Sequence, residues 1–145
     1  MSRKPVFEGA ATAIVTPFCA KGVDYEQLGK SILFQLEQGI DAIVVAGTTG
    51  EASTMSNEEH EKVIAFAVSQ VANRVPVIAG TGSNDTSHAV HLSRYAQEAG
   101  ADMVLLVPPY YNKTTQRGLL AQDFASVQVL LFWHRHQEYC ARDDS

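Results

Sequence analysis

Four short apolar segments recur in this chain at intervals of about 30 residues, and each leads through a polar turn into a helical pattern. The segments do not alternate with polar residues and are rich in alanine, valine and isoleucine; they are residues 11–16, 42–46, 75–79 and 103–107. Strands that are apolar on both faces belong to parallel sheets covered by helices. The repeat therefore predicts an α/β fold in which strands and helices alternate along the chain.

The helices between these strands have recognisable ends. Asp24 is suited to cap the first helix, which we expect to end at Gly39. Ser56 and Glu59 form a capping box at the start of the second helix. The later boundaries are predicted in the same way: a third helix between Asn84 or Asp85 and Gly100, and a fourth from about Thr115 through Phe124.

The turn after the second strand, Gly47-Thr48-Thr49-Gly50-Glu51, is chemically distinctive. Its hydroxyls and amides can point at a small carboxylate, and Gly47 and Gly50 allow the close backbone approach that such a site needs. Thr-Thr-Gly also occurs in ordinary strand-to-helix turns, so this turn alone leaves both interpretations open. Residues 80–84 and 108–113 form comparable turns after later strands. Because ligands in α/β folds bind at the carboxyl ends of parallel strands, we expect the three turns to converge on one mouth.

Composition narrows the class of partner. With 145 residues, 46% of them hydrophobic and 19% charged, the chain has the size and composition of one globular domain. Its net charge of −5 argues against nucleic acid or an anionic membrane as a general partner. There is no apolar run approaching 18 residues and no signal-peptide core, so we expect a cytoplasmic protein. Cys19 and Cys140 match no zinc pattern, and both should be reduced.

The pattern changes after about residue 124. We expect residues 1–124 to form one structural unit and residues 125–145 to be a divergent tail. His134, His136 and Cys140 would share one side of a strand and could bind a metal ion, but a polar terminus that binds nothing specific is the favoured interpretation. No metal site is therefore predicted.

Four motifs, in this order and spacing, resemble the dihydrodipicolinate synthase family: Val15-Thr16-Pro17-Phe18, Gly47-Thr48-Thr49-Gly50-Glu51, Ala79-Gly80-Thr81-Gly82 and Pro109-Tyr110-Tyr111-Asn112-Lys113. The family belongs to the pyruvate-dependent class I aldolases, together with N-acetylneuraminate lyase. The resemblance covers residues 5–124 and implies about the first four βα units of a TIM (β/α)8 barrel. Residues 1–124 would then be the N-terminal half of that barrel.

The resemblance also implies an activity and a site. Family members condense pyruvate with aspartate semialdehyde through a Schiff base, in lysine and diaminopimelate biosynthesis, without a metal or organic cofactor. Thr48 and Tyr111 match two residues of the family's Tyr-Thr-Tyr proton relay, and Thr49, between Gly47 and Gly50, matches the residue that binds the pyruvate carboxylate. The family donates this tyrosine across a dimer interface, which implies a homo-oligomer assembled as a dimer of dimers.

A possible effector site follows from the same resemblance. His60, Asn84 and Tyr110 stand where some family members bind lysine as a feedback inhibitor. Asn57 replaces a histidine of the sensitive pattern, and His88 replaces the glutamate that would hold the effector's ammonium group. We therefore expect a full-length version to be weakly inhibited by lysine or insensitive to it.

The residue that forms the Schiff base in this family is missing. A strand lysine is required, whereas the lysines of this chain are Lys4, Lys21, Lys30, Lys62 and Lys113, none of which lies in a predicted strand. The second relay tyrosine should fall near Phe132 and Trp133 and is also absent. A frameshift or a truncation would explain the abrupt change, and the chain alone should be inactive. Three alternatives stay open: a non-catalytic half-barrel binding module, a partner of a full-length paralogue, and another pyruvate aldolase such as a sugar-acid lyase.

Overall fold

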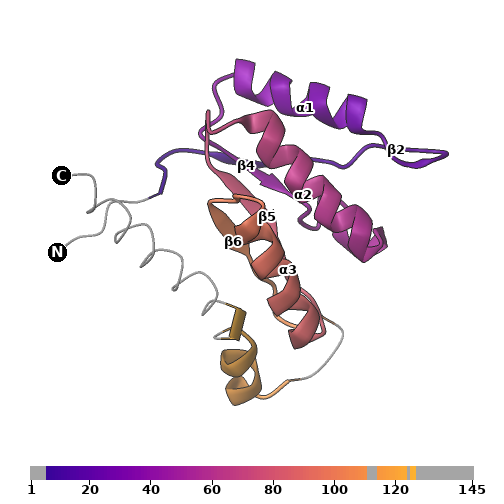
Figure 1. Cartoon of the computed structure of the whole chain (residues 1–145). Coiled ribbons are helices and arrows are strands. Elements are labelled where there is room, and N and C mark those ends of the chain that lie inside the picture. Colours follow the sequence, from indigo (N-terminus) through magenta and orange to yellow (C-terminus); the bar gives the residue numbers. More distant parts are fainter. Residues whose placement is uncertain (1–5, 111–113, 124, 127–145) are drawn as a thin grey trace.

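The computed structural model describes residues 6–110, 114–123, 125 and 126. Strands and helices alternate along the chain, as the apolar repeat predicts (Figure 1). The elements in order are β1 (Ala11–Ala13), β2 (Phe18–Cys19), β3 (Gly22–Val23), α1 (Tyr25–Glu37), β4 (Ala42–Val45), the 3-10 helix η1 (Ala52–Thr54), α2 (Asn57–Val71), β5 (Val77–Gly80), α3 (Thr86–Glu98) and β6 (Met103–Leu105). Residues 116–123, 125 and 126 are also helical.

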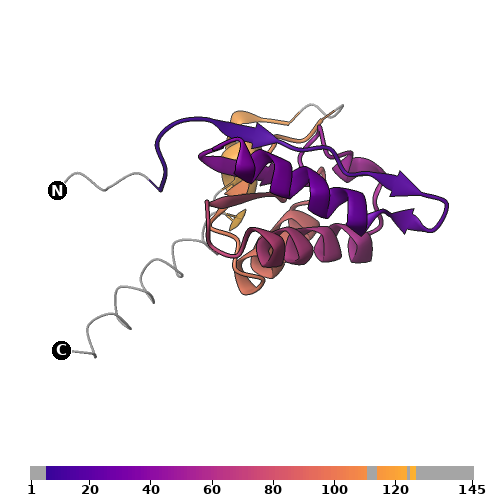
Figure 2. The same ribbon diagram turned by 90° about the horizontal axis from the view of Figure 1, so that it is seen from above.

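The main sheet is parallel and follows the chain order β1-β4-β5-β6. Figures 1 and 2 show α1, α2 and α3 on one face of this sheet, and each helix packs against the next. A sheet whose strands follow one another without reversal, with all its helices on one side, is the arrangement of successive units in a (β/α)8 barrel. A doubly wound sheet would reverse its order and place helices on both faces.

The predicted helix ends are confirmed at the residues that form them. The Asp24 carboxylate accepts a hydrogen bond from the Gln27 amide at 3.0 Å, and both bonds of the Ser56–Glu59 capping box are present. Asp85, the second of the two candidates, caps α3 through the Ser87 amide at 2.8 Å. The glycines at the ends of α1 and α3 have φ values of +78° and +93°, in the left-handed region that favours glycine.

The core lies between the sheet and the helices. Strand residues that face the helices are buried, including Ile43 and Val45 on β4 and Val77 on β5. Leu28 and Ile32 of α1 and Val63, Ile64 and Ala67 of α2 complete this layer. The spacing of these helix residues places them on one face, so burial of one apolar stripe stabilises each helix on the sheet.

The hairpin formed by β2 and β3 was not predicted. Phe18 pairs with Val23 and Cys19 with Gly22, and the Asp24 amide donates a hydrogen bond to the Pro17 carbonyl at 2.8 Å. Two-residue strands are too short to show an alternating pattern, which is why the sequence gives no sign of them. The hairpin fills the connection between β1 and α1 and leads the chain directly to the cap at Asp24.

Candidate functional site

The turn between β4 and η1 is held by its own backbone. The Gly50 amide donates to the Gly47 carbonyl at 3.1 Å, and the Glu51 amide donates to the Thr48 carbonyl at the same distance. Thr48 and Thr49 are exposed, and no other described residue is bonded to their hydroxyls. These hydroxyls are therefore free of contacts within the turn that would occupy them.

The glycines of this turn have different roles from those expected. A Cβ atom on Gly47 would meet its nearest neighbours at 3.7 and 3.9 Å, which are ordinary van der Waals distances. A larger residue would therefore fit at position 47, and close packing does not require a glycine there. Gly50 is more restricted, because a Cβ atom there would lie 3.1 Å from Thr16 Oγ1. The left-handed conformation falls instead on Ala46 (φ 52°), which precedes the turn, and on Glu51 (φ 56°), its last residue.

The three distinctive turns surround a single pocket of about 760 Å³. Thr48 lines it from the first turn, Gly82 and Ser83 from the second, and Pro108 and Tyr110 from the third. The prediction that the turns converge is thus confirmed. Thr81 departs from it, because its side chain is fully buried and its hydroxyl lies 3.0 Å from Ser93 Oγ on α3. Thr81 therefore attaches the second turn to α3, and its hydroxyl does not face the pocket.

The residues of the possible effector site lie close together. The Asn84 Oδ1 atom accepts a hydrogen bond from the Tyr110 amide at 2.6 Å and so fixes the third turn against the second. His60 and Tyr110 both line the pocket. The imidazole of His60 is 4% exposed, and its Nε2 lies 2.8 Å from the Gly80 carbonyl oxygen, which fixes Nε2 as the donor. Burial, reinforced by the nearby His88, lowers the pKa of His60 and favours the neutral ring.

Sequence reasoning gave no role of their own to Thr16, which lies in the first resemblance motif, or to Ser83, which lies in the second turn. The Thr16 hydroxyl is buried beneath Gly50 and has no hydrogen-bond partner among the described residues. Ser83 Oγ lies 3.1 Å from His88 Nδ1, and the other ring nitrogen, His88 Nε2, is buried without a hydrogen-bond partner among the described residues. The position of Thr16, at the end of an apolar segment and just before a proline, is a local signal that could have pointed to such a role.

All three lysines whose structure is described are exposed to solvent, and two of them form ion pairs with glutamates. Lys30 and Lys62 lie 2.6 Å from Glu26 and Glu58, one helical turn earlier, and these hydrogen bonds raise the pKa of each lysine. A protonated amine is not a nucleophile, so neither side chain is suited to attack a carbonyl carbon. Lys21 is exposed, and Lys4 and Lys113 lie outside the described residues.

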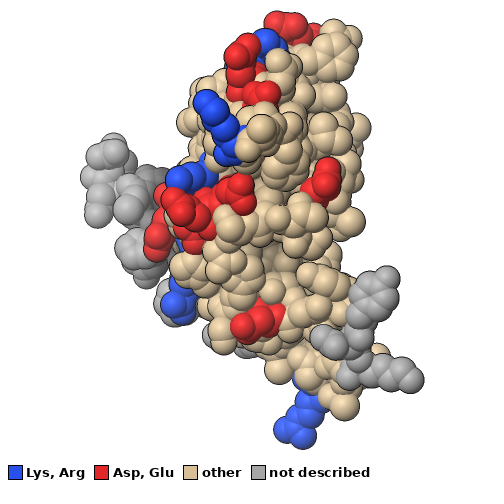
Figure 3. Space-filling model, turned by 90° about the vertical axis from the view of Figure 1, so that its right-hand side faces the viewer, with Lys and Arg blue, Asp and Glu red and all other residues tan. Residues whose placement is uncertain are grey.

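Two predicted features fall on residues whose structure is not described: Tyr111, and the group His134, His136 and Cys140. Among the residues that the structure describes, no cluster of three or more histidine, cysteine or acidic side chains is arranged to hold a metal ion. None of the described helices is long and apolar enough to cross a membrane. On the face in Figure 3, basic side chains are scattered beside acidic ones and form no continuous basic surface.

Residues 6–128 match the model of the dihydrodipicolinate synthetase family. The chain is 64% identical over 135 residues to the 4-hydroxy-tetrahydrodipicolinate synthase of Acetivibrio thermocellus, covering 90% of this chain and 46% of that one. It superimposes on the crystal structure of dihydrodipicolinate synthase from Aquifex aeolicus with a TM-score of 0.82 and 54% identity, covering 85% of this chain and 42% of that one. A lysine-bound enzyme of this kind from Cyanidioschyzon merolae gives a TM-score of 0.82 at 39% identity, covering 87% and 43%. The chain thus spans less than half the length of these relatives.

Proposed function

The chain belongs to the dihydrodipicolinate synthetase family, and we propose that it supplies the pyruvate-binding half of a 4-hydroxy-tetrahydrodipicolinate synthase. The observation that carries this proposal is the Thr48-Thr49 turn, whose free hydroxyls lie at the mouth of the sheet beside the pocket. The complete enzyme would be a lyase of lysine and diaminopimelate biosynthesis. It would act in the cytoplasm on pyruvate and aspartate semialdehyde.

Each residue of the site has a proposed role. Thr49 binds the pyruvate carboxylate through its hydroxyl and amide, in a turn shaped by Gly47 and Gly50. Thr48 and Tyr111 pass protons between the reacting carbon atoms and solvent, with Tyr111 acting across a subunit interface in a dimer of dimers. Hydroxyl groups suit this role because they transfer protons without placing a free charge in the pocket.

The covalent step needs a residue from outside these 145. A neutral lysine amine attacks the pyruvate ketone and expels water, and the resulting iminium accepts the electron pair that is released when the methyl carbon loses a proton. The enamine formed in this way donates that pair to the aldehyde carbon of aspartate semialdehyde, which makes the carbon–carbon bond. Neither Lys30 nor Lys62 can do this, because both are solvated and ion-paired. The chain alone therefore binds and orients without forming the covalent intermediate, and no organic cofactor or metal is needed.

Joining this half to a complementary half tests the proposal. A chimera of residues 1–126 with the second half of the Acetivibrio thermocellus relative should condense pyruvate with aspartate semialdehyde, whereas the 145-residue chain should not. Product formation in a coupled assay is the measurement. A chimera that folds and cleaves sugar acids but does not use aspartate semialdehyde would favour the sugar-acid lyase alternative.

We also propose that the pocket containing His60, Asn57 and Tyr110 discriminates against lysine. No acidic side chain lines the pocket in the described part of the chain, and His88 stands where a carboxylate would pair with an ammonium group. An ammonium group placed there would lose water without gaining a counter-charge, which is unfavourable.

The corresponding prediction is that submillimolar lysine leaves the turnover of the chimera unchanged. The variant His88→Glu should become measurably more sensitive, because it restores a carboxylate to the pocket wall. Initial rates measured against lysine concentration provide the test. Inhibition of the unmodified chimera in that range would contradict the assignment.

A further inference from the structure

Both edges of the main sheet are unpaired within the described residues. The Ile14 amide donates to the Val44 carbonyl of β4 at 3.0 Å. Because successive residues of a strand direct their amides to opposite sides, the amides of Ala11 and Ala13 point away from the sheet. At the other edge, the Leu105 carbonyl accepts from Thr81 at 3.0 Å, which directs the amides of Val104 and Leu106 outward. Unpaired parallel edges are templates for another strand.

The sheet face opposite the helices is apolar, and it is exposed at the two edge strands, whereas Ile78 near its centre is only 8% exposed. Ala13, Val44, Ile78 and Met103 are in register across the four strands and share this face. Val15 and Leu105, two residues beyond Ala13 and Met103, are 54% and 43% exposed. Positions on this face carry no charged side chain, so the face is suited to burial against another apolar surface.

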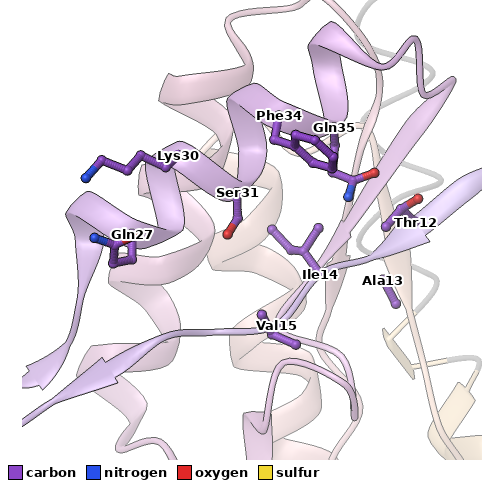
Figure 4. A pocket seen from close by; sticks show the side chains of 9 residues that line it. All are labelled: Thr12, Ala13, Ile14, Val15, Gln27, Lys30, Ser31, Phe34 and Gln35. Carbon is purple, nitrogen blue, oxygen red and sulfur yellow. The ribbon is translucent and has the colours of Figure 1, made fainter.

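A groove of about 400 Å³ runs between α1 and the edge strand β1. Figure 4 shows Phe34 and Gln35 extending from α1 above Thr12 and Ile14 of the strand segment. Since α2 covers the other side of α1, this groove is the position that a neighbouring helix would fill. At the opposite edge, the helical residues that follow β6 include Leu120, which is 69% exposed.

We propose that a second copy of this chain covers this face and closes an eight-stranded parallel barrel. A twofold axis that coincides with the barrel axis keeps all strands parallel and places β6 of each copy beside β1 of the other. One symmetric contact then pairs both edges, buries both apolar faces and sets the last helix of each copy against the α1–β1 groove of its partner. Eight strands form a barrel whose interior is filled by side chains, so the joined faces pack without a channel.

Charge and symmetry favour a second copy over an unrelated partner. An unrelated chain would have to offer two parallel edges at the right separation, together with an uncharged face and an exposed helix. A second copy presents all four features by construction. This proposal does not depend on the catalytic assignment, because it concerns the strands and helices and not the Thr48-Thr49 turn.

Sedimentation and light scattering of the 145-residue chain test the proposal. The mass should be that of two chains in the micromolar range. Ala13→Pro removes an outward amide without touching the bonds between β1 and β4, and Leu105→Lys places a charge on the apolar face. Both variants should have the mass of one chain while keeping the circular dichroism of the parent.

Leu33→Lys is the matched control. Leu33 is 39% exposed on α1 but does not line the groove, so this variant should stay dimeric. A parent chain with the mass of one copy would overturn the proposal. So would a dimer, or a larger assembly, that survives both Ala13→Pro and Leu105→Lys, because its interface would then lie elsewhere.

Discussion

Thr48→Val in the chimera should lower kcat by about 100-fold, the loss typical of removing a proton-transfer group. Valine has nearly the shape of threonine, and the Thr48 hydroxyl is not bonded to any described residue, so the fold should not be disturbed. The Michaelis constant for pyruvate should change little, because Thr48 is assigned to proton transfer and not to carboxylate binding. Steady-state kinetics with varied pyruvate separate these two effects.

Thr49→Val is the companion variant. It should raise the Michaelis constant for pyruvate, since the carboxylate loses a hydroxyl partner while the backbone amide stays in place. If Thr48→Val leaves kcat unchanged, Thr48 only forms the turn, and the proton relay must be assigned to other groups.

Gly80→Ala should destabilise the chain by about 3 kcal/mol, which is large for the addition of one methyl group. A Cβ atom at Gly80 would lie 2.2 Å from the Ala46 carbonyl oxygen and 2.9 Å from Gly47 Cα. These are backbone atoms at the end of β4, so the clash can be relieved only by separating β4 from β5. The displaced Gly80 carbonyl would also lose its 2.8 Å contact with His60. Urea unfolding followed by circular dichroism gives the free energy.

Gly47→Ala provides the control, because its added Cβ atom would make only ordinary contacts at 3.7 Å or more. It should change the free energy of unfolding by less than about 1 kcal/mol. Equal losses in the two variants would show that the β4–β5 contact is not the constraint that the geometry indicates.

The parts of the fold that were predicted correctly are those with a repeated or local signal. Apolar segments without alternation predicted the parallel strands, and the side chains of Asp24 and Ser56 predicted helix starts because they satisfy free backbone amides. The strand segments were predicted too long, at residues 11–16 and 103–107. Apolar residues continue there beyond the ends of β1 and β6, and one of them, Ile14, is buried in the core.

The details of the site were harder to predict because they depend on contacts between distant segments. That Gly80 matters more than Gly47 follows from the approach of β5 to the turn after β4, which no local pattern encodes. The left-handed conformation of Ala46 is likewise imposed by its surroundings, because alanine disfavours it. The burial of Thr81 against Ser93 depends on the packing of α3. The motif could place Thr48 and Thr49 at the mouth, but it could not show which neighbours support them.

The central claim is the proposal that no lysine of these 145 residues forms a Schiff base with pyruvate, and borohydride trapping tests it most directly. Incubation with pyruvate and borohydride, followed by intact-mass spectrometry, should leave the 145-residue chain unmodified. The same treatment should add one reduced pyruvate to the chimera, at a lysine of the joined second half. A covalent pyruvate adduct on a lysine of the 145-residue chain itself would contradict the account.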